Sequence, residues 1–194
     1  MIITVSGTPG SGKTTLAVSL AKELGYEHYY AGSMYREMAK KRGMTINEIL
    51  TLSEKDPSID KEIDDTQKKL AQNKKNAIIE GRVSYFLIPE SLKIFVKCSL
   101  DTSAKRILQD LKDEKIRNIR NEGTAETLQA VRERLTERMN SDIKRYKKYY
   151  NIQNAYAPEQ FDIVIETDNL TPDEALIVAQ KRIQEYLNSK GQSL

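Results

Sequence analysis

The residues with the clearest chemical potential form a loop near the start of the chain. Residues 7–14 read Gly-Thr-Pro-Gly-Ser-Gly-Lys-Thr, which matches the pattern G-x-x-x-x-G-K-[ST]. An apolar, β-branched run precedes the loop and an amphipathic helical pattern follows it, as this motif requires. Glycines at such positions let backbone N–H groups point inward at anionic oxygens, and the start of the following helix adds partial positive charge. The loop therefore predicts a site for the phosphates of a nucleoside triphosphate.

Each residue of the loop has an expected part in that site. The Lys13 ammonium can reach the β- and γ-phosphates, and the Thr14 hydroxyl, on the first helical turn, can ligate a Mg²⁺ ion that bridges them. The competing interpretation is an ordinary glycine-rich turn between a strand and a helix. The full set expected to contact the triphosphate is Gly7, Thr8, Pro9, Gly10, Ser11, Gly12, Lys13, Thr14 and Thr15.

Arginines further along the chain are candidates for binding a second anion. Arg36 lies early in a predicted helix, and Arg82 follows a predicted strand that ends at Ile79-Glu80-Gly81. Both are expected to project beyond the carboxyl edge of the sheet, where doubly wound folds bind ligands. A guanidinium group can grip a phosphate with two hydrogen bonds, and Glu80 can orient a water molecule on Mg²⁺. For either arginine alone, an ordinary surface position is the alternative.

A third group of charged residues lies on a predicted helix near residues 134–150. Arg138, Asp142 and Arg145 are spaced by four and three residues, so they share one helical face. A solvated stripe of salt bridges would show the same spacing. The same part of the chain also holds Arg120, Arg132 and Arg134. This number of arginines exceeds what a stripe needs, whereas a site that faces two polyphosphates must neutralise several charges.

The elements that must position these residues alternate between strands and helices. Short apolar runs predict strands over residues 1–6, 26–31, 76–82, 92–97 and 161–166, the first of them central. Periodicity and capping residues predict helices over 13–24, 32–42, 46–52, 58–73, 101–112 and 124–150, and a last one from Thr171-Pro172 that frays beyond Asn188. The charged segment 113–123 is expected to be a mobile loop or arm. The alternation implies an α/β fold of three layers, with a five-stranded parallel sheet and helices on both faces.

Composition limits the class of protein. The chain has 194 residues, 39% of them apolar, which fits one domain with a core. Its apolar runs fall far short of the roughly 20 residues of a membrane span, and no basic-then-apolar leader precedes Ile2, so a cytoplasmic location is expected. Cys98 and His28 are the only residues of their types, which excludes an internal disulfide and histidine-rich metal sites. Cys98 is expected to be a small buried residue rather than a reactive thiol, and His28 a surface or packing residue rather than a catalyst.

Together these residues resemble the nucleoside monophosphate kinases, and among them the short, archaeal type of cytidylate kinase. The resemblance rests on Gly7–Thr14, Gly32-Ser33-Met34-Tyr35-Arg36, Glu80-Gly81-Arg82, the Arg138/Asp142/Arg145 face followed by Tyr146, and the strand from Asp162 to Thr167. It implies a P-loop kinase fold in one domain over residues 1–194, with an acceptor-binding helical insert at about 32–73 and a short lid at about 115–123. It also implies a monomer that uses ATP with Mg²⁺ as donor and CMP or dCMP as acceptor.

The resemblance further implies roles for individual residues. Arg36 and Arg82 hold the acceptor monophosphate, with Ser33, Glu80 and Gly81 beside them. Arg138 and Asp142 reach the acceptor nucleoside or its phosphate, and Arg145 helps to neutralise the transferring group. Lys13, Arg82, Arg138 and Arg145 are thus the expected catalytic set, and Arg117 and Arg120 of the lid are expected to contact ATP. The residues after the Glu-Gly-Arg element, Val83-Ser84-Tyr85-Phe86, differ from the small residues usual in the family.

Three other functions stay open on the sequence alone. A kinase for AMP, UMP or a shikimate-like small molecule would use the same loop and similar arginines. A nucleotide-dependent switch or a ribosome-assembly ATPase would hydrolyse ATP without a small acceptor. Nucleic-acid binding would use Lys144, Arg145, Lys147 and Lys148 with the interleaved Tyr146, Tyr149 and Tyr150. Because the net charge is only +3 and acidic residues are abundant, we expect no nucleic-acid partner, and the short apolar runs predict no membrane partner.

Overall fold

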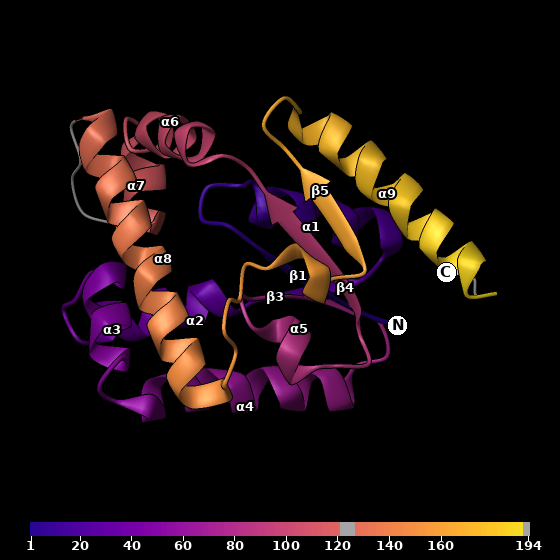
Figure 1. The fold of residues 1–194 in the computed structure, drawn as a ribbon, viewed down its shortest axis with the longest axis horizontal. Helices are drawn as coiled ribbons and strands as arrows, with labels where there is room; N and C mark the ends of the chain where they lie inside the picture. The colour runs from indigo at the N-terminus through magenta and orange to yellow at the C-terminus, as the bar shows by residue number, and fades with distance from the viewer. Residues whose placement is uncertain (121–126, 192–194) are drawn as a thin grey trace. The chain divides into compact units, whose positions relative to one another are not determined.

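The computed structural model describes residues 1–120 and 127–191; residues 121–126 and 192–194 lie outside the described part of the chain (Figure 1). The chain divides into two compact units. The first, called unit 1 below, consists of Met1–Tyr30, Asp64–Cys98 and Tyr156–Leu194. The second, unit 2, consists of Ala31–Ile63 and Ser99–Ala155.

Unit 1 is built on a parallel sheet. Its strands are β1 (Ile2–Gly7), β2 (Glu27–Tyr30), β3 (Ala77–Glu80), β4 (Leu92–Lys97) and β5 (Ile163–Glu166). Their order is β2-β3-β1-β4-β5, and every neighbouring pair is parallel, which confirms the predicted sheet with the first strand in its centre. In this register Val5 lies opposite Glu80, so the carboxyl ends of β1 and β3 meet at one edge. That edge is where ligands of such sheets bind.

Helices cover both faces of this sheet, as predicted. On one face, α1 (Lys13–Leu24) and α9 (Pro172–Ser189) pack their apolar residues against inward-facing strand residues such as Val5 and Ile94. On the other face, α5 (Ser84–Leu87) contacts β1, and the ring of Phe161 packs between those of Phe95 and Tyr85. A 3₁₀ turn at Pro158–Gln160 precedes the last strand. The three-layer α/β fold is therefore confirmed.

Unit 2 is helical. It contains α2 (Ala31–Lys41), α3 (Ile46–Ser53), the start of α4 (Pro57–Asn73), α6 (Leu100–Asp110), α7 (Glu114–Arg120) and α8 (Leu128–Tyr150). α3 packs against α2 and α8, and α6 packs against α8. Two apolar clusters hold these helices together, one around Ile49 and Ile59 and one around Ile107 and Leu135. In the described part of the chain, no helix has the length and apolar character needed to cross a membrane.

One predicted loop is a helix. Residues 113–123 were expected to form a loop or arm because they lack apolar periodicity, but α7 covers Glu114–Arg120. The Asp113 carboxylate accepts the backbone N–H groups of Lys115 (2.8 Å) and Ile116 (3.2 Å), and the last turn carries basic residues that suit the helix dipole. Residues 121–123, which the same prediction included, lie outside the described residues.

Candidate functional site

The Gly7–Thr14 loop joins β1 to α1 in unit 1, as the motif predicts. Gly10 and Gly12 have φ angles of 76° and 82°, in the left-handed region that residues with a side chain rarely adopt. At Gly7 a Cβ atom would stand 2.1 Å from the carbonyl oxygen of Val96, so a side chain has no room there. The three glycines are thus required by the backbone. A loop of this shape ahead of a helix presents N–H groups to phosphate oxygens.

Hydrogen bonds from the ends of neighbouring strands fix the loop. The Thr8 N–H donates to the Val96 carbonyl oxygen at 3.1 Å, and the Thr8 hydroxyl accepts from the Cys98 N–H at 3.4 Å. From the segment after β5, the Thr167 hydroxyl donates to the carbonyl oxygen of Ser11 at 2.9 Å. Contacts within the protein therefore hold the loop in this shape, which lowers the cost of binding. Thr167 had no predicted role, because only the packed fold brings it to residue 11.

The predicted magnesium ligand Thr14 contacts the predicted water-orienting residue Glu80. Glu80 ends β3 and is fully buried, and its Oε1 atom accepts a hydrogen bond from the Thr14 hydroxyl at 2.7 Å. The other carboxylate oxygen, Oε2, lies 3.2 Å from Nε2 of His28 on β2. The sequence prediction for His28 was a surface or packing position. A signal was available, because a parallel pairing of residues 26–31 with 76–82 places His28 on the strand beside the one that ends at Glu80.

The Thr14–Glu80 pair fits a magnesium ion that arrives with a nucleotide. Both groups are oxygen donors, the type that Mg²⁺ prefers, and Mg²⁺ usually keeps several waters and takes further ligands from substrate phosphates. Among the described residues, no cluster of three or more His, Cys, Asp or Glu side chains is arranged to hold a metal. The residues therefore suit a shared metal–nucleotide site better than a resident metal site.

Arg82 follows the end of β3 directly. The residue before it, Gly81, is fixed on both sides, because its N–H donates to the Val5 carbonyl oxygen at 3.1 Å and its own carbonyl oxygen accepts from the Ser6 hydroxyl at 2.7 Å. Arg82 itself is half-buried. The backbone at the carboxyl edge of the sheet thus sets where the Arg82 side chain starts. Glu80, Gly81 and Arg82 lie together with the phosphate loop in unit 1.

The other predicted site residues lie in unit 2. Ser33 and Arg36 are on α2, where Ser33 is exposed and Arg36 is half-buried. The Arg36 Nε–H donates to the carbonyl oxygen of Arg120 at 3.0 Å, and the Arg120 guanidinium pairs with Asp110 at 3.0 Å. Arg117 and Arg120, the predicted lid arginines, stand in the last turn of α7. The structure thus joins α2 to the described part of the predicted lid.

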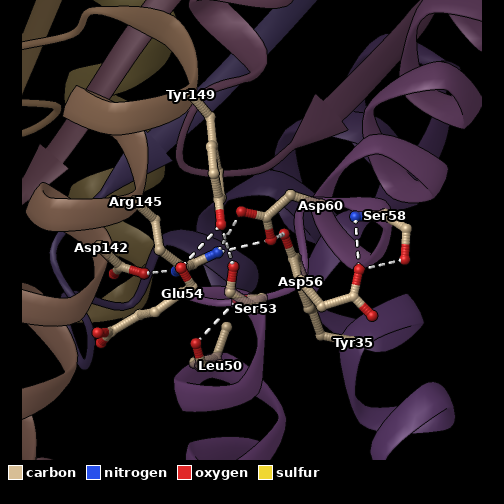
Figure 2. A network of polar contacts seen from close by, with 10 residues as sticks. All are labelled: Tyr35, Leu50, Ser53, Glu54, Asp56, Ser58, Asp60, Asp142, Arg145 and Tyr149. Atoms are coloured by element: carbon tan, nitrogen blue, oxygen red, sulfur yellow. Dashed lines mark hydrogen bonds and ion pairs between the residues drawn. The ribbon is translucent and has the colours of Figure 1, made fainter.

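Arg145 lies at the centre of a buried ion cluster (Figure 2). Its guanidinium binds both carboxylate oxygens of Asp60 at 2.6 and 2.7 Å, and it binds Asp142 at 2.5 Å. Tyr35 donates to Asp60 at 2.6 Å. Arg145, Asp60 and Asp142 are each at most 1% exposed. The predicted face of residues 138, 142 and 145 is therefore not a solvated stripe at its last two positions, and those two side chains join α8 to α4.

The charges of this cluster shift the pKa of its members. Burial lowers the pKa of Arg145, but the acidic groups around it, Tyr146, Asp142, Tyr35 and Asp60, outweigh burial and raise it well above its ordinary value. Burial, followed by the charges of Tyr146 and Asp60, holds the pKa of Tyr35 well above its ordinary value. Arg145 is thus a permanent cation inside unit 2. Asp60 had no predicted role, since nothing in its local sequence marks it, and Tyr35 was predicted only as part of the Gly32–Arg36 element.

The aromatic and basic end of α8 is largely used for packing. The Tyr149 hydroxyl lies 2.9 Å from the carbonyl oxygens of both Ser53 and Glu54 (Figure 2). Lys148 donates to the Glu54 carbonyl oxygen at 3.1 Å. Tyr146 is buried. Lys144, Lys147 and Lys148 are exposed, but stacking on nucleic-acid bases would also need exposed rings. The burial of Tyr146 and the contacts of Tyr149 within unit 2 argue against that alternative.

Arg138 lines a surface hollow of unit 2. The hollow has a volume of about 320 Å³ between α3 and α8. Its lining mixes both signs of charge with amides, hydroxyls and one leucine: Asn47, Leu50, Thr51, Glu54, Arg134, Glu137, Arg138, Asn140, Ser141 and Lys144. Arg138 is half-buried there, unlike its neighbours on the helix face, Asp142 and Arg145. The three residues of the predicted face thus differ in their access to a ligand.

Comparison with solved structures places the fold. The chain is similar to an uncharacterised protein from Eubacterium ventriosum, with a TM-score of 0.65 and 19% identity over 95% of this chain and 98% of that one. It is also similar to the shikimate kinase from Bacteroides thetaiotaomicron, with a TM-score of 0.61 and 16% identity over 95% and 98% of the two chains. At such identities these likenesses show the fold alone.

Comparison of sequences places the family. The chain is 33% identical to a cytidylate kinase from Methanopyrus kandleri over 96% of this chain and 95% of that protein, and 35% identical to one from Methanospirillum hungatei over 98% and 100%. A third, from Sulfurisphaera tokodaii, is 35% identical over 97% and 96%. The model of the cytidylate kinase-like family matches residues 2–169. With the phosphate loop, the Glu80–Thr14 pair and the parallel sheet in place, the chain belongs to the cytidylate kinase-like family.

Proposed function

We propose that this protein transfers the γ-phosphoryl group of ATP to CMP or dCMP, giving ADP and CDP or dCDP. The observation that carries the proposal is the likeness to proteins named cytidylate kinase over nearly the whole length of both chains. The phosphate loop with its Thr14–Glu80 contact supports the donor half of the reaction. The likeness to shikimate kinases, at 16–19% identity, does not extend to their substrate.

On the donor side, the loop and α1 bind the triphosphate. Backbone N–H groups within residues 7–15, other than Pro9, which has none, contact the phosphates, and the Lys13 ammonium lies along the β- and γ-phosphates. Thr14 and Glu80 hold Mg²⁺, directly or through its water, and the bound ion supplies positive charge at the phosphate oxygens. Arg117 and Arg120 of α7 contact ATP when it binds. Because contacts within the protein hold this loop in shape, its donors stabilise developing charge without reorganising.

On the acceptor side, arginines bind the monophosphate. Arg82 and Arg36 grip the phosphate with paired N–H groups, assisted by Ser33 and the Glu80-Gly81 segment. Arg138 and Asp142 reach the nucleoside or its phosphate, and Arg145 neutralises the transferring group. Asp142 and Arg145 are bonded to each other in unit 2. For either of them to contact a substrate, this pair must rearrange. Their roles therefore need a test separate from that of Arg82.

The chemistry needs no general base. The attacking oxygen of a monophosphate is already anionic, so catalysis consists of positioning the two phosphates in line and neutralising their charge. Movement of the predicted insert (about 32–73) and of the predicted lid (about 115–123) would exclude water and prevent loss of the γ-phosphate to hydrolysis. We further propose that the protein acts as a monomer in the cytoplasm, which size-exclusion chromatography and fractionation can test.

A panel of acceptors tests the proposed reaction. The protein is incubated with ATP and Mg²⁺ and, separately, with CMP, dCMP, UMP, AMP, GMP and shikimate, and the products are separated by ion-exchange chromatography. We expect CDP and dCDP to form fastest. Formation of another product at a higher rate would reassign the acceptor, and ADP release that is independent of every acceptor would support an ATPase switch instead.

A further inference from the structure

His28 is the second partner of the buried Glu80 carboxylate. Thr14 satisfies Oε1 of this group, and His28 Nε2 lies 3.2 Å from Oε2. Glu80 has no exposed surface, and a buried carboxylate is costly unless its oxygens are hydrogen-bonded. A carboxylate can only accept, so Nε2 of His28 carries the proton that it donates. The two contacts together fix both oxygens of Glu80.

The sheet register explains why this histidine reaches this carboxylate. β2 and β3 run parallel, with His28 opposite Ile78 and Tyr30 opposite Glu80, so these side chains share one face of the sheet. Ile78 belongs to the apolar cluster that includes Leu16 of α1, which identifies this face as the one that α1 covers. His28 reaches Glu80 diagonally along the strand pair.

The orientation of the His28 ring is also restricted. Its side chain is 18% exposed, and its ring stacks on that of Tyr30 with centroids 6.4 Å apart and an interplanar angle of 15°. The ring is therefore held with Nε2 directed at Glu80. None of the roles given above to residues of the nucleotide site explains why the His28 ring is held against Glu80.

We propose that His28 is a positioning residue of the magnesium–nucleotide site. By holding Oε2, it keeps Oε1 of Glu80 at the Thr14 hydroxyl, where the carboxylate orders water on the Mg²⁺ that accompanies the nucleotide. His28 contacts neither the nucleotide nor the metal and acts through Glu80. The inference rests on the proposed function only in taking a nucleotide with Mg²⁺ as the ligand. Removal of such an outer partner typically changes metal affinity or activity by about 10–100-fold.

Binding of ADP with and without magnesium tests this role. Calorimetry gives the Kd of ADP in Mg²⁺ and in a chelator, and their ratio measures how much the metal tightens binding. His28→Phe keeps a stacking ring but cannot donate, so we expect this ratio to fall about tenfold or more, while the Kd without metal stays unchanged. His28→Gln places an amide N–H near the Nε2 position and is expected to restore most of the ratio. Glu27→Gln, an exposed change on the same strand, is the matched control.

The single histidine permits a second measurement on the unaltered protein. Because the chain has one histidine, its ring NMR signals need no assignment. We expect the Nε2 proton to be downfield and protected from exchange without nucleotide, to move when ADP and Mg²⁺ are added together, and to lose protection in Glu80→Gln. This readout stays decisive even where His28→Phe fails to fold. A freely exchanging Nε2 proton, or a magnesium ratio that His28→Phe leaves unchanged, would show that the ring only packs.

Failure of this inference differs from failure of the proposed function. If magnesium no longer tightens ADP binding in His28→Phe but the wild-type protein makes no CDP, the positioning role of His28 stands and the CMP kinase activity is rejected. If the wild-type protein makes CDP and His28→Phe retains both the ratio and the rate, the activity stands and the positioning role is rejected.

Discussion

At the scale of single residues, the proposed binding of the acceptor phosphate depends most directly on Arg82. Two hydrogen bonds fix the backbone of the preceding residue, Gly81, so the Arg82 side chain extends from a defined point after the end of β3. We expect Arg82→Ala to raise the KM for CMP and to lower kcat, together costing roughly 10²–10³-fold in kcat/KM, as for the loss of one charged donor at a reacting centre. Steady-state kinetics with CMP and ATP varied in turn measures this.

A conservative variant makes the Arg82 test specific. Arg82→Lys keeps the charge but cannot form paired hydrogen bonds, so it is expected to recover only part of the loss. The KM for ATP should change little in either variant. Wild-type kinetics for CMP in Arg82→Ala would remove this arginine from the acceptor site.

Tyr85 gives the protein a predictable loss of stability in alkali. Burial raises the pKa of Tyr85 to about 12, from an ordinary value of 10.0. The unfolded chain therefore loses this proton at lower pH than the folded chain does. The contribution of Tyr85 to stability is complete below pH about 10 and is lost between pH about 10 and about 12, at no more than about 1.4 kcal/mol per pH unit.

Urea unfolding of Tyr85→Phe at several pH values checks this. The variant loses the hydrogen bond to Gln160 and is expected to be less stable by about 1 kcal/mol at pH 8. Between pH 10 and 12 its free energy of unfolding should fall less steeply than that of the wild type. Parallel pH dependences in the two proteins would mean that the Tyr85 hydroxyl titrates normally.

At the scale of elements, Arg145 holds the helices of unit 2 together. Its bonds to Asp60 and Asp142 join α4 to α8 (Figure 2). Arg145→Ala would leave two buried carboxylates without their cation, so we expect the free energy of unfolding to fall by about 3–5 kcal/mol. Arg145→Lys keeps the charge but not the paired donors of the guanidinium group. Its free energy of unfolding should therefore lie between those of the wild type and Arg145→Ala. Urea unfolding followed by circular dichroism measures all three proteins.

Arg182 supplies the control for this change. It is an exposed arginine on α9 with only a distant contact, 3.9 Å, to Glu185. Arg182→Ala is expected to alter stability by less than about 0.5 kcal/mol. A similarly small effect of Arg145→Ala would contradict the structural role. Arg145→Lys that folds well but has lost turnover would instead support the proposed contact with the transferring group.

The elements show where a sequence pattern suffices and where it does not. α1 was predicted with its observed bounds, because a glycine precedes it, leucines recur on one face and Gly25 ends it in a left-handed conformation. α7 was not predicted, because it is stabilised by the Asp113 side chain, which accepts backbone N–H groups at its start, and by the acidic first turn and basic last turn. Neither feature produces apolar periodicity. α5, with four residues, is too short for any period to show.

At the scale of the whole molecule, the predictable part of the site is the part encoded locally. The phosphate loop needs only residues 7–14 in order, and the fixed positions of Glu80 and Thr14 follow once two parallel strands are paired. The partners of Arg145 could not be predicted, because Asp60 is 85 residues away and only helix packing brings it close. The contacts of His28 and Thr167 depend in the same way on the assembled sheet.

The fate of the γ-phosphoryl group tests the central claim most directly. ATP carrying radioactive phosphorus in its γ-phosphate is incubated with the protein and Mg²⁺, with and without CMP, and the label is followed chromatographically. We predict that the label appears in CDP, that little inorganic phosphate forms without CMP, and that Lys13→Ala abolishes nearly all transfer. Label released as inorganic phosphate at a rate that CMP does not change, with none in CDP, would contradict the account.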